Sequence, residues 1–166
     1  MADKSNFTPE QWQQVLESVM MAGIAVSAAE PSGLWGLLKE SFAGSSALAA
    51  AKTDPTAGPL IKAVVADFET AQGRSTLRDG MKGTLSGLKP PEVKARCIET
   101  LTQVGALVDA NAPDDAPAFK AWLRQISQHV AEAATEGGFL GIGGTLVSPA
   151  EKATLAEISG ALRLAA

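Results

Sequence analysis

Apolar residues recur every three or four positions from residue 12 onward. The first stripe consists of Trp12, Val15, Leu16, Val19, Gly23 and Val26. This spacing matches one face of an α-helix and not the two-residue alternation of a half-buried strand. Small residues widen that face and let neighbouring helices approach closely. The pattern predicts a central helix packed inside a bundle.

The same period returns in six further segments separated by loops rich in Gly, Pro, Ser or Asp. These predicted helices run from about residue 34 to 42, 60 to 73, 74 to 88, 91 to 110, 118 to 135 and 149 to 164. The Ala-rich run 47–51 also favours helix over strand. The sequence therefore predicts an all-α, six- to seven-helix bundle, with residues 1–166 forming one domain.

Two helix starts carry the same local signal. Thr8 and Ser148 each precede a proline, and each stands three residues before a Gln or Glu, which are Gln11 and Glu151. A hydroxyl at the cap and a Gln or Glu three residues on can exchange hydrogen bonds with the backbone, while proline suits the first helical position. Both sites are predicted capping boxes.

One segment breaks the helical pattern near the C-terminus. Two short apolar runs flank Gly143 and Gly144, which predicts a β-hairpin near residues 138–147. The glycines could instead form a phosphate-binding loop, but such loops need a following Gly-Lys-Ser/Thr or a preceding strand. Turn chemistry is the simpler interpretation.

Composition and charge limit the classes of function. The chain has 46% hydrophobic residues, one cysteine and a net charge of −4. A single cysteine cannot form an internal disulfide, and the N-terminus has no signal-peptide pattern, so we expect a cytoplasmic protein. The longest uncharged stretch around the first predicted helix is too short to span a membrane. The acidic total weighs against nucleic-acid binding.

Charge is unevenly distributed along the sequence. Residues 52–96 carry a net charge of +3, and the rest of the chain carries −7. Within the positive part, Arg74, Arg78 and Lys82 are spaced four residues apart and so share one helix face. They could bind an anion or an acidic partner, although a solvated basic face is the ordinary interpretation.

Two side chains could carry chemistry if the fold supplied partners. His129 is the only histidine and precedes Glu132 by three residues, but one histidine cannot build the repeated Glu-x-x-His set of helical metal sites. Cys97 lies on an apolar stripe, which favours a buried structural thiol over a nucleophile. The sequence indicates no cofactor.

The C-terminal third resembles tellurite-resistance TerB-like domains. The resemblance rests on Ala133-Ala134-Thr135-Glu136-Gly137-Gly138 at a helix end, followed by Val147-Ser148-Pro149-Ala150-Glu151-Lys152 at the next helix start. It implies a helical fold. Residues 139–145 are apolar and Gly-rich where the family has an acidic Asp-Gly loop, so no metal or acidic site is transferred.

These observations favour a non-enzymatic interaction or scaffolding protein that binds a protein partner or self-associates. The candidate interface residues are the apolar Phe139, Leu140, Ile142 and Leu146 and the basic face 74–82. The alternative is a module that binds a small apolar ligand between helices near Trp12, Trp35 or Trp122. An enzyme would need a carboxylate pair drawn from Glu17, Glu30, Glu132 and Glu136.

Overall fold

The computed structural model describes residues 1–29, 46–136 and 147–165. Within these ranges the chain forms seven α-helices, one 3-10 helix and no strand. The elements are η1 (Lys4–Asn6), α1 (Pro9–Ala29), α3 (Ser46–Thr53), α4 (Pro59–Glu69), α5 (Ala71–Leu85), α6 (Pro90–Asn111), α7 (Ala116–Glu136) and α8 (Pro149–Ala161). The all-α prediction is confirmed. The predicted helix 34–42 and nearly all of the predicted hairpin lie outside the described residues.

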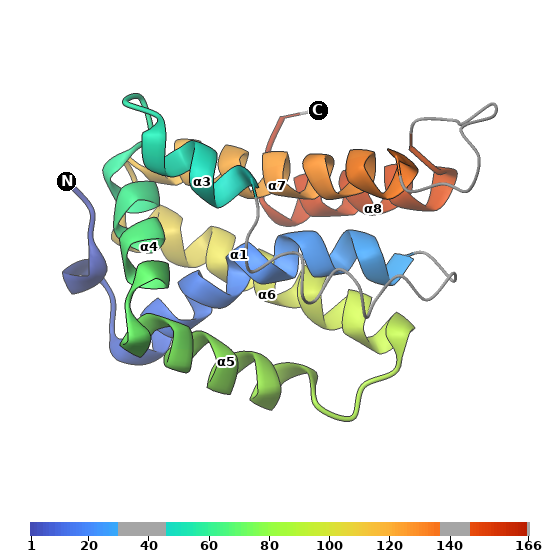
Figure 1. Cartoon of the computed structure of the whole chain (residues 1–166), viewed down its shortest axis with the longest axis horizontal. Coiled ribbons are helices and arrows are strands. Elements are labelled where there is room, and N and C mark those ends of the chain that lie inside the picture. Colours follow the sequence, from blue (N-terminus) through green and yellow to red (C-terminus); the bar gives the residue numbers. More distant parts are fainter. Residues whose placement is uncertain (30–45, 137–146, 166) are drawn as a thin grey trace.

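Helix α1 is the centre of the bundle. It packs mainly against α6 and α7 and also contacts α4, α5 and α8. Figure 1 shows α1 and α7 running in one direction and α6 and α8 in the other, with α4 crossing one end of the bundle. The small residues predicted to widen the helix face, Ala22, Gly23 and Ala25, are buried in α1. Their size allows the neighbouring backbones to approach.

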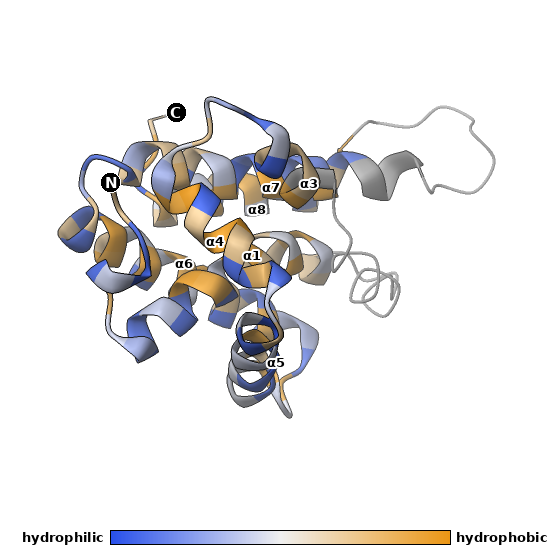
Figure 2. Cartoon of the chain, turned by 60° about the vertical axis from the view of Figure 1, so that its left-hand side comes forward, coloured by the Kyte–Doolittle hydropathy of each residue, from blue (hydrophilic) through white to orange (hydrophobic). Residues whose placement is uncertain are grey.

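The described helices share one hydrophobic core. Its largest side chains without exposed surface include Leu16 of α1, Leu60 of α4, Leu101 of α6, Phe119 of α7 and Ile158 of α8. Figure 2 shows that α5 carries more hydrophilic residues than α1 or α4. Helix α5 accordingly contributes only partly buried apolar side chains, such as those of Leu77 and Met81.

The boundary between α4 and α5 differs from the prediction. The sequence pattern placed Gly73 near the end of one long helix, whereas α4 ends at Glu69 and α5 begins at Ala71. Thr70 between them has extended backbone angles, and its Oγ1 accepts a 2.8 Å hydrogen bond from the amide of Gly73. Capping by Thr70 therefore starts a new helix where the apolar period alone would continue the old one.

Both predicted capping boxes are confirmed. The amide of Gln11 donates to Oγ1 of Thr8, and the Thr8 amide donates to Oε1 of Gln11. At the start of α8, the Glu151 amide donates to Oγ of Ser148 at 3.1 Å, and the Ser148 amide donates to Oε2 of Glu151 at 2.9 Å. Local sequence therefore fixes where these two helices begin.

None of the helices that the structure describes combines the length and the apolar character needed to cross a membrane.

Candidate functional site

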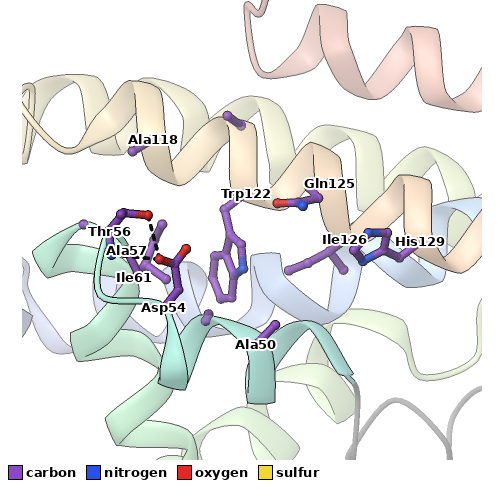
Figure 3. Close-up of a pocket in the computed structure, with 13 residues that line it drawn as sticks. Ala50, Asp54, Thr56, Ala57, Ile61, Ala118, Trp122, Gln125, Ile126 and His129 are labelled. Carbon is purple, nitrogen blue, oxygen red and sulfur yellow. Dashed lines mark hydrogen bonds between the residues drawn. The ribbon is translucent and has the colours of Figure 1, made fainter.

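A pocket of about 340 Å³ lies between α3 and α7, closed at one end by the loop before α4. Figure 3 shows Trp122 reaching from α7 toward α3, with Asp54 and Thr56 on one side of its ring and Gln125 and His129 on the other. The lining residues are Ala50, Ala51, Asp54, Thr56, Ala57, Gly58, Ile61, Ala118, Ala121, Trp122, Gln125, Ile126 and His129.

The pocket is hollow because small side chains face one another across it. Five of its lining residues are alanines and one is glycine. The indole ring of Trp122 forms another wall and is only 8% exposed. It packs beside the ring of Phe119, with 5.9 Å between the two ring centroids. A rigid aromatic wall beside methyl groups leaves a largely apolar volume that none of the described side chains fills.

Polar groups stand on the two sides of the indole ring. Oδ1 of Asp54 accepts hydrogen bonds of 2.7 Å from the amide and 2.6 Å from the hydroxyl of Thr56. The Thr56 hydroxyl first, and then its amide, hold the pKa of Asp54 below its usual range, so this carboxylate stays ionised at neutral pH. Gln125 and His129 are exposed, and they lie one turn apart on α7.

The two titratable groups of the pocket do not stand together. His129 and Asp54 lie on different sides of the Trp122 ring, so they do not form the adjacent nucleophile–base pair of covalent catalysis. Across the described part of the chain, no three His, Cys, Asp or Glu side chains come together to hold a metal.

The carboxylates that could have formed a catalytic pair have different surroundings. Glu17 is buried against α5, where Thr84 donates to it. Glu132 is exposed on α7 and accepts a hydrogen bond from Gln128. Residue 30 and the side chain at 136 lie outside the described residues.

The predicted burial of Cys97 is confirmed. Its side chain has no exposed surface, and its Sγ is 3.3 Å from Sδ of Met21. Burial raises the pKa of this thiol to about 12. A thiol that stays protonated is a poor nucleophile.

The basic face predicted on α5 from the four-residue spacing of three cations includes one that is bound to the backbone of α4. Arg74, Arg78 and Lys82 are all exposed on that helix. Arg74, however, turns back and donates to the carbonyl oxygens of Phe68 and Glu69 at 3.3 and 2.7 Å. It thus caps the last turn of α4, a role that cations often take at helix C-termini. Arg78 and Lys82 form no ion pair with any residue that the structure describes.

The apolar candidates Phe139, Leu140, Ile142 and Leu146 lie outside the described residues. Within the described ranges, Met1 is the only large hydrophobic residue that is exposed. Other large apolar side chains, such as those of Leu77 and Met81 on α5, are partly buried against the core.

Sequence reasoning singled out Trp122 and His129 but missed the rest of the pocket. Ala118 and Ala121 share a helix face with Trp122, which was a weak signal of space beside the indole ring. Nothing in the sequence placed α3, some 70 residues earlier, opposite that face.

Known proteins do not extend this picture. Comparisons with protein-family models, with curated proteins and with solved structures find no match to the chain.

Proposed function

We propose that the protein is a non-catalytic module that binds a small, largely apolar molecule between α3 and α7. The observation that carries this proposal is the hollow of about 340 Å³ beside the indole ring of Trp122. Its volume falls within the usual range for ligand sites, roughly 300–1,000 Å³, and its walls combine apolar surface with a few polar groups.

The lining indicates the chemistry of the ligand. A flat or aliphatic body would lie against Trp122 and the alanine methyl groups, and a terminal hydrogen-bonding group would reach Gln125 or His129. The ionised Asp54 on the other side disfavours an anion there. A neutral ligand with one polar end fits best.

Titration with the neutral fluorescent probe N-phenyl-1-naphthylamine tests this proposal. The native chain should bind it saturably, and Ala121→Leu, which adds bulk inside the pocket, should weaken binding about tenfold or more. The matched control is Ala153→Leu on the exposed side of α8, which should bind as the native protein does. Equal affinity of Ala121→Leu and the native chain would refute the proposal.

A second candidate function, docking of a protein partner or of another copy, is favoured by the sequence near residue 140. Phe139, Leu140, Ile142 and Leu146 concentrate large apolar side chains in eight positions around a Gly-Gly pair. As a β-hairpin between 138 and 147, this segment would offer an edge for pairing. The TerB-like resemblance and the cytoplasmic location stay predictions of the sequence and add no function.

Sedimentation velocity separates this candidate from the first. The double substitution Phe139→Ser with Ile142→Ser should abolish self-association or partner binding while leaving probe binding between α3 and α7 unchanged. A native chain that stays monomeric at high concentration and purifies without a partner would remove the docking candidate.

A further inference from the structure

A second cavity of about 270 Å³, separate from the α3–α7 pocket, lies between α1, α5 and α6. Two helices contribute polar residues at the same spacing, i, i+3, i+4 and i+7. These are Glu10, Gln13, Gln14 and Glu17 on α1, and Arg96, Glu99, Thr100 and Gln103 on α6, with Thr84 added from α5. This spacing aligns each set along one helix face, so two polar stripes face a shared hollow.

The floor of this cavity holds a buried carboxylate. Glu17 is 3% exposed, accepts 2.9 Å and 3.1 Å hydrogen bonds from Gln13 and Thr84, and forms no ion pair with any described residue. Space for it comes from Gly80, where a Cβ atom would lie 2.0 Å from Oε1 of Glu17. A buried carboxylate held only by neutral donors is costly, and a cation in the adjoining cavity would offset that cost.

The floor also holds the buried hydroxyl of Thr100. Thr100 lines the cavity and is 7% exposed, and no described residue forms a hydrogen bond with its side chain. Helical threonines commonly donate to the carbonyl four residues earlier, as Thr102 does to Ile98 at 2.8 Å. A buried hydroxyl left unpaired is unfavourable unless something else hydrogen-bonds to it.

The charge of the lining selects the ligand. Three carboxylates and one guanidinium line the cavity, and Arg96 already pairs with Glu99 at 3.4 Å. The remaining charge is that of Glu17 on the floor and Glu10 on the exposed rim. An ammonium group has three N–H donors, which match the carboxylate of Glu17, the hydroxyl of Thr100 and an amide oxygen of a lining glutamine.

We infer that this cavity binds a small aliphatic diamine, with one ammonium group held by Glu17 and Thr100 and the other near Glu10. An organic cation fits better than a metal ion, because the described His, Cys, Asp and Glu side chains form no group of three suited to a metal. Glu17 supplies the charge attraction, and Thr100 orients the bound ammonium.

Calorimetric titration of the full chain with 1,4-diaminobutane, at neutral pH and low salt, tests this inference. Saturable binding is expected, and 1,4-butanediol, of the same length but uncharged, should not bind. Glu17→Gln keeps the size of the side chain and should weaken diamine binding about tenfold or more. Glu69→Gln, an exposed control on α4, should leave it unchanged. Absence of binding to the native chain, or equal affinity of Glu17→Gln, would overturn the inference.

Thr100→Val gives a second test that does not depend on the folding of the Glu17 variant. Replacing an unpaired buried hydroxyl with a methyl group should raise the Tm by about 2–4 °C. The same change should weaken diamine binding several-fold. A lower Tm together with unchanged diamine affinity would show that Thr100 has a purely structural role and would overturn its part in the site.

Discussion

Cys97 illustrates how the core controls the chemistry of a single side chain. Because burial raises its pKa to about 12, almost no thiolate exists at pH 8. We expect the native protein to resist 5,5′-dithiobis(2-nitrobenzoate) at that pH, and the protein unfolded in urea to react fully. Rapid labelling of the native chain would contradict the buried position.

The same thiol makes stability depend on alkaline pH. Its folded pKa is raised above the ordinary value of 9.0, so the folded state keeps a proton that the unfolded state loses. The stabilising contribution is complete below about pH 9 and declines as pH rises toward about 12. Urea unfolding at pH 8 and pH 10.5 should show a smaller loss of stability in Cys97→Ala than in the native chain.

Two glycines of α5 should respond oppositely to the same substitution. At Gly73 a Cβ atom would lie 2.0 Å from the backbone oxygen of Asp67, whereas at Gly83 it would meet nothing within 4 Å. Gly73→Ala should destabilise the protein by about 1–3 kcal/mol because backbone must move. Gly83→Ala should stabilise it by up to about 1 kcal/mol through helix propensity. Chemical denaturation measures both, and a stabilising Gly73→Ala would contradict the close approach.

Helices α1, α5 and α8 each begin at a residue whose hydroxyl accepts a hydrogen bond from the first turn. Thr8 and Ser148 form their boxes as predicted, and Thr70 ends the continuity of α4 and α5 although the apolar period runs on. At the scale of an element, a side-chain hydrogen-bond acceptor at the cap position therefore decides where a helix begins, even where the apolar helical pattern continues across that position.

The cap of α8 gives a prediction at this scale. Ser148→Ala removes the acceptor for the Glu151 amide and should cost about 1 kcal/mol of unfolding free energy. Ser148→Thr keeps a hydroxyl acceptor and should cost much less. Equal losses in the two variants, measured by urea denaturation, would show that the hydroxyl is not what stabilises this helix start.

At the scale of the molecule, Asp67 connects the N-terminal part of the chain to α4. Its Oδ2 accepts a 2.7 Å hydrogen bond from Nε1 of Trp12, which is 2% exposed, and lies 3.3 Å from Nζ of Lys4. The ammonium group of Lys4 is largely exposed, so its ion pair contributes little. The hydrogen bond from the Trp12 indole to Asp67 is therefore expected to contribute most of the stability that this link provides.

Substitutions at Asp67 test this link. Asp67→Ala leaves a buried indole N–H without an acceptor and should cost about 1–3 kcal/mol. Asp67→Asn retains an oxygen acceptor and should lose less, while Lys4→Ala should change stability by no more than about 0.5 kcal/mol. Thermal unfolding ranks the three variants, and a Lys4→Ala loss as large as that of Asp67→Ala would reverse the assignment.

Sequence by itself determined the helical class, the central helix, two helix starts and the burial of Cys97. Each of these depends on interactions within a few residues: the 3.6-residue apolar period, the reach of a capping hydroxyl, and the position of a thiol on an apolar stripe. The sequence pattern wrongly placed Gly73 near the end of one long helix, because the spacing of apolar residues does not reveal that Thr70 caps a new helix.

Only the tertiary structure decided where the cavities are. The α3–α7 pocket needs alanines of helices about 70 residues apart to face one another, and the polar cavity needs the stripe of α1 to meet that of α6. Each stripe is visible in the sequence as polar residues at helical spacing, which alone is typical of a solvated surface. Packing buries Glu17, since α5 approaches it closely at Gly80, and it also buries Thr100 on α6. Contacts between distant segments are not encoded in local periodicity.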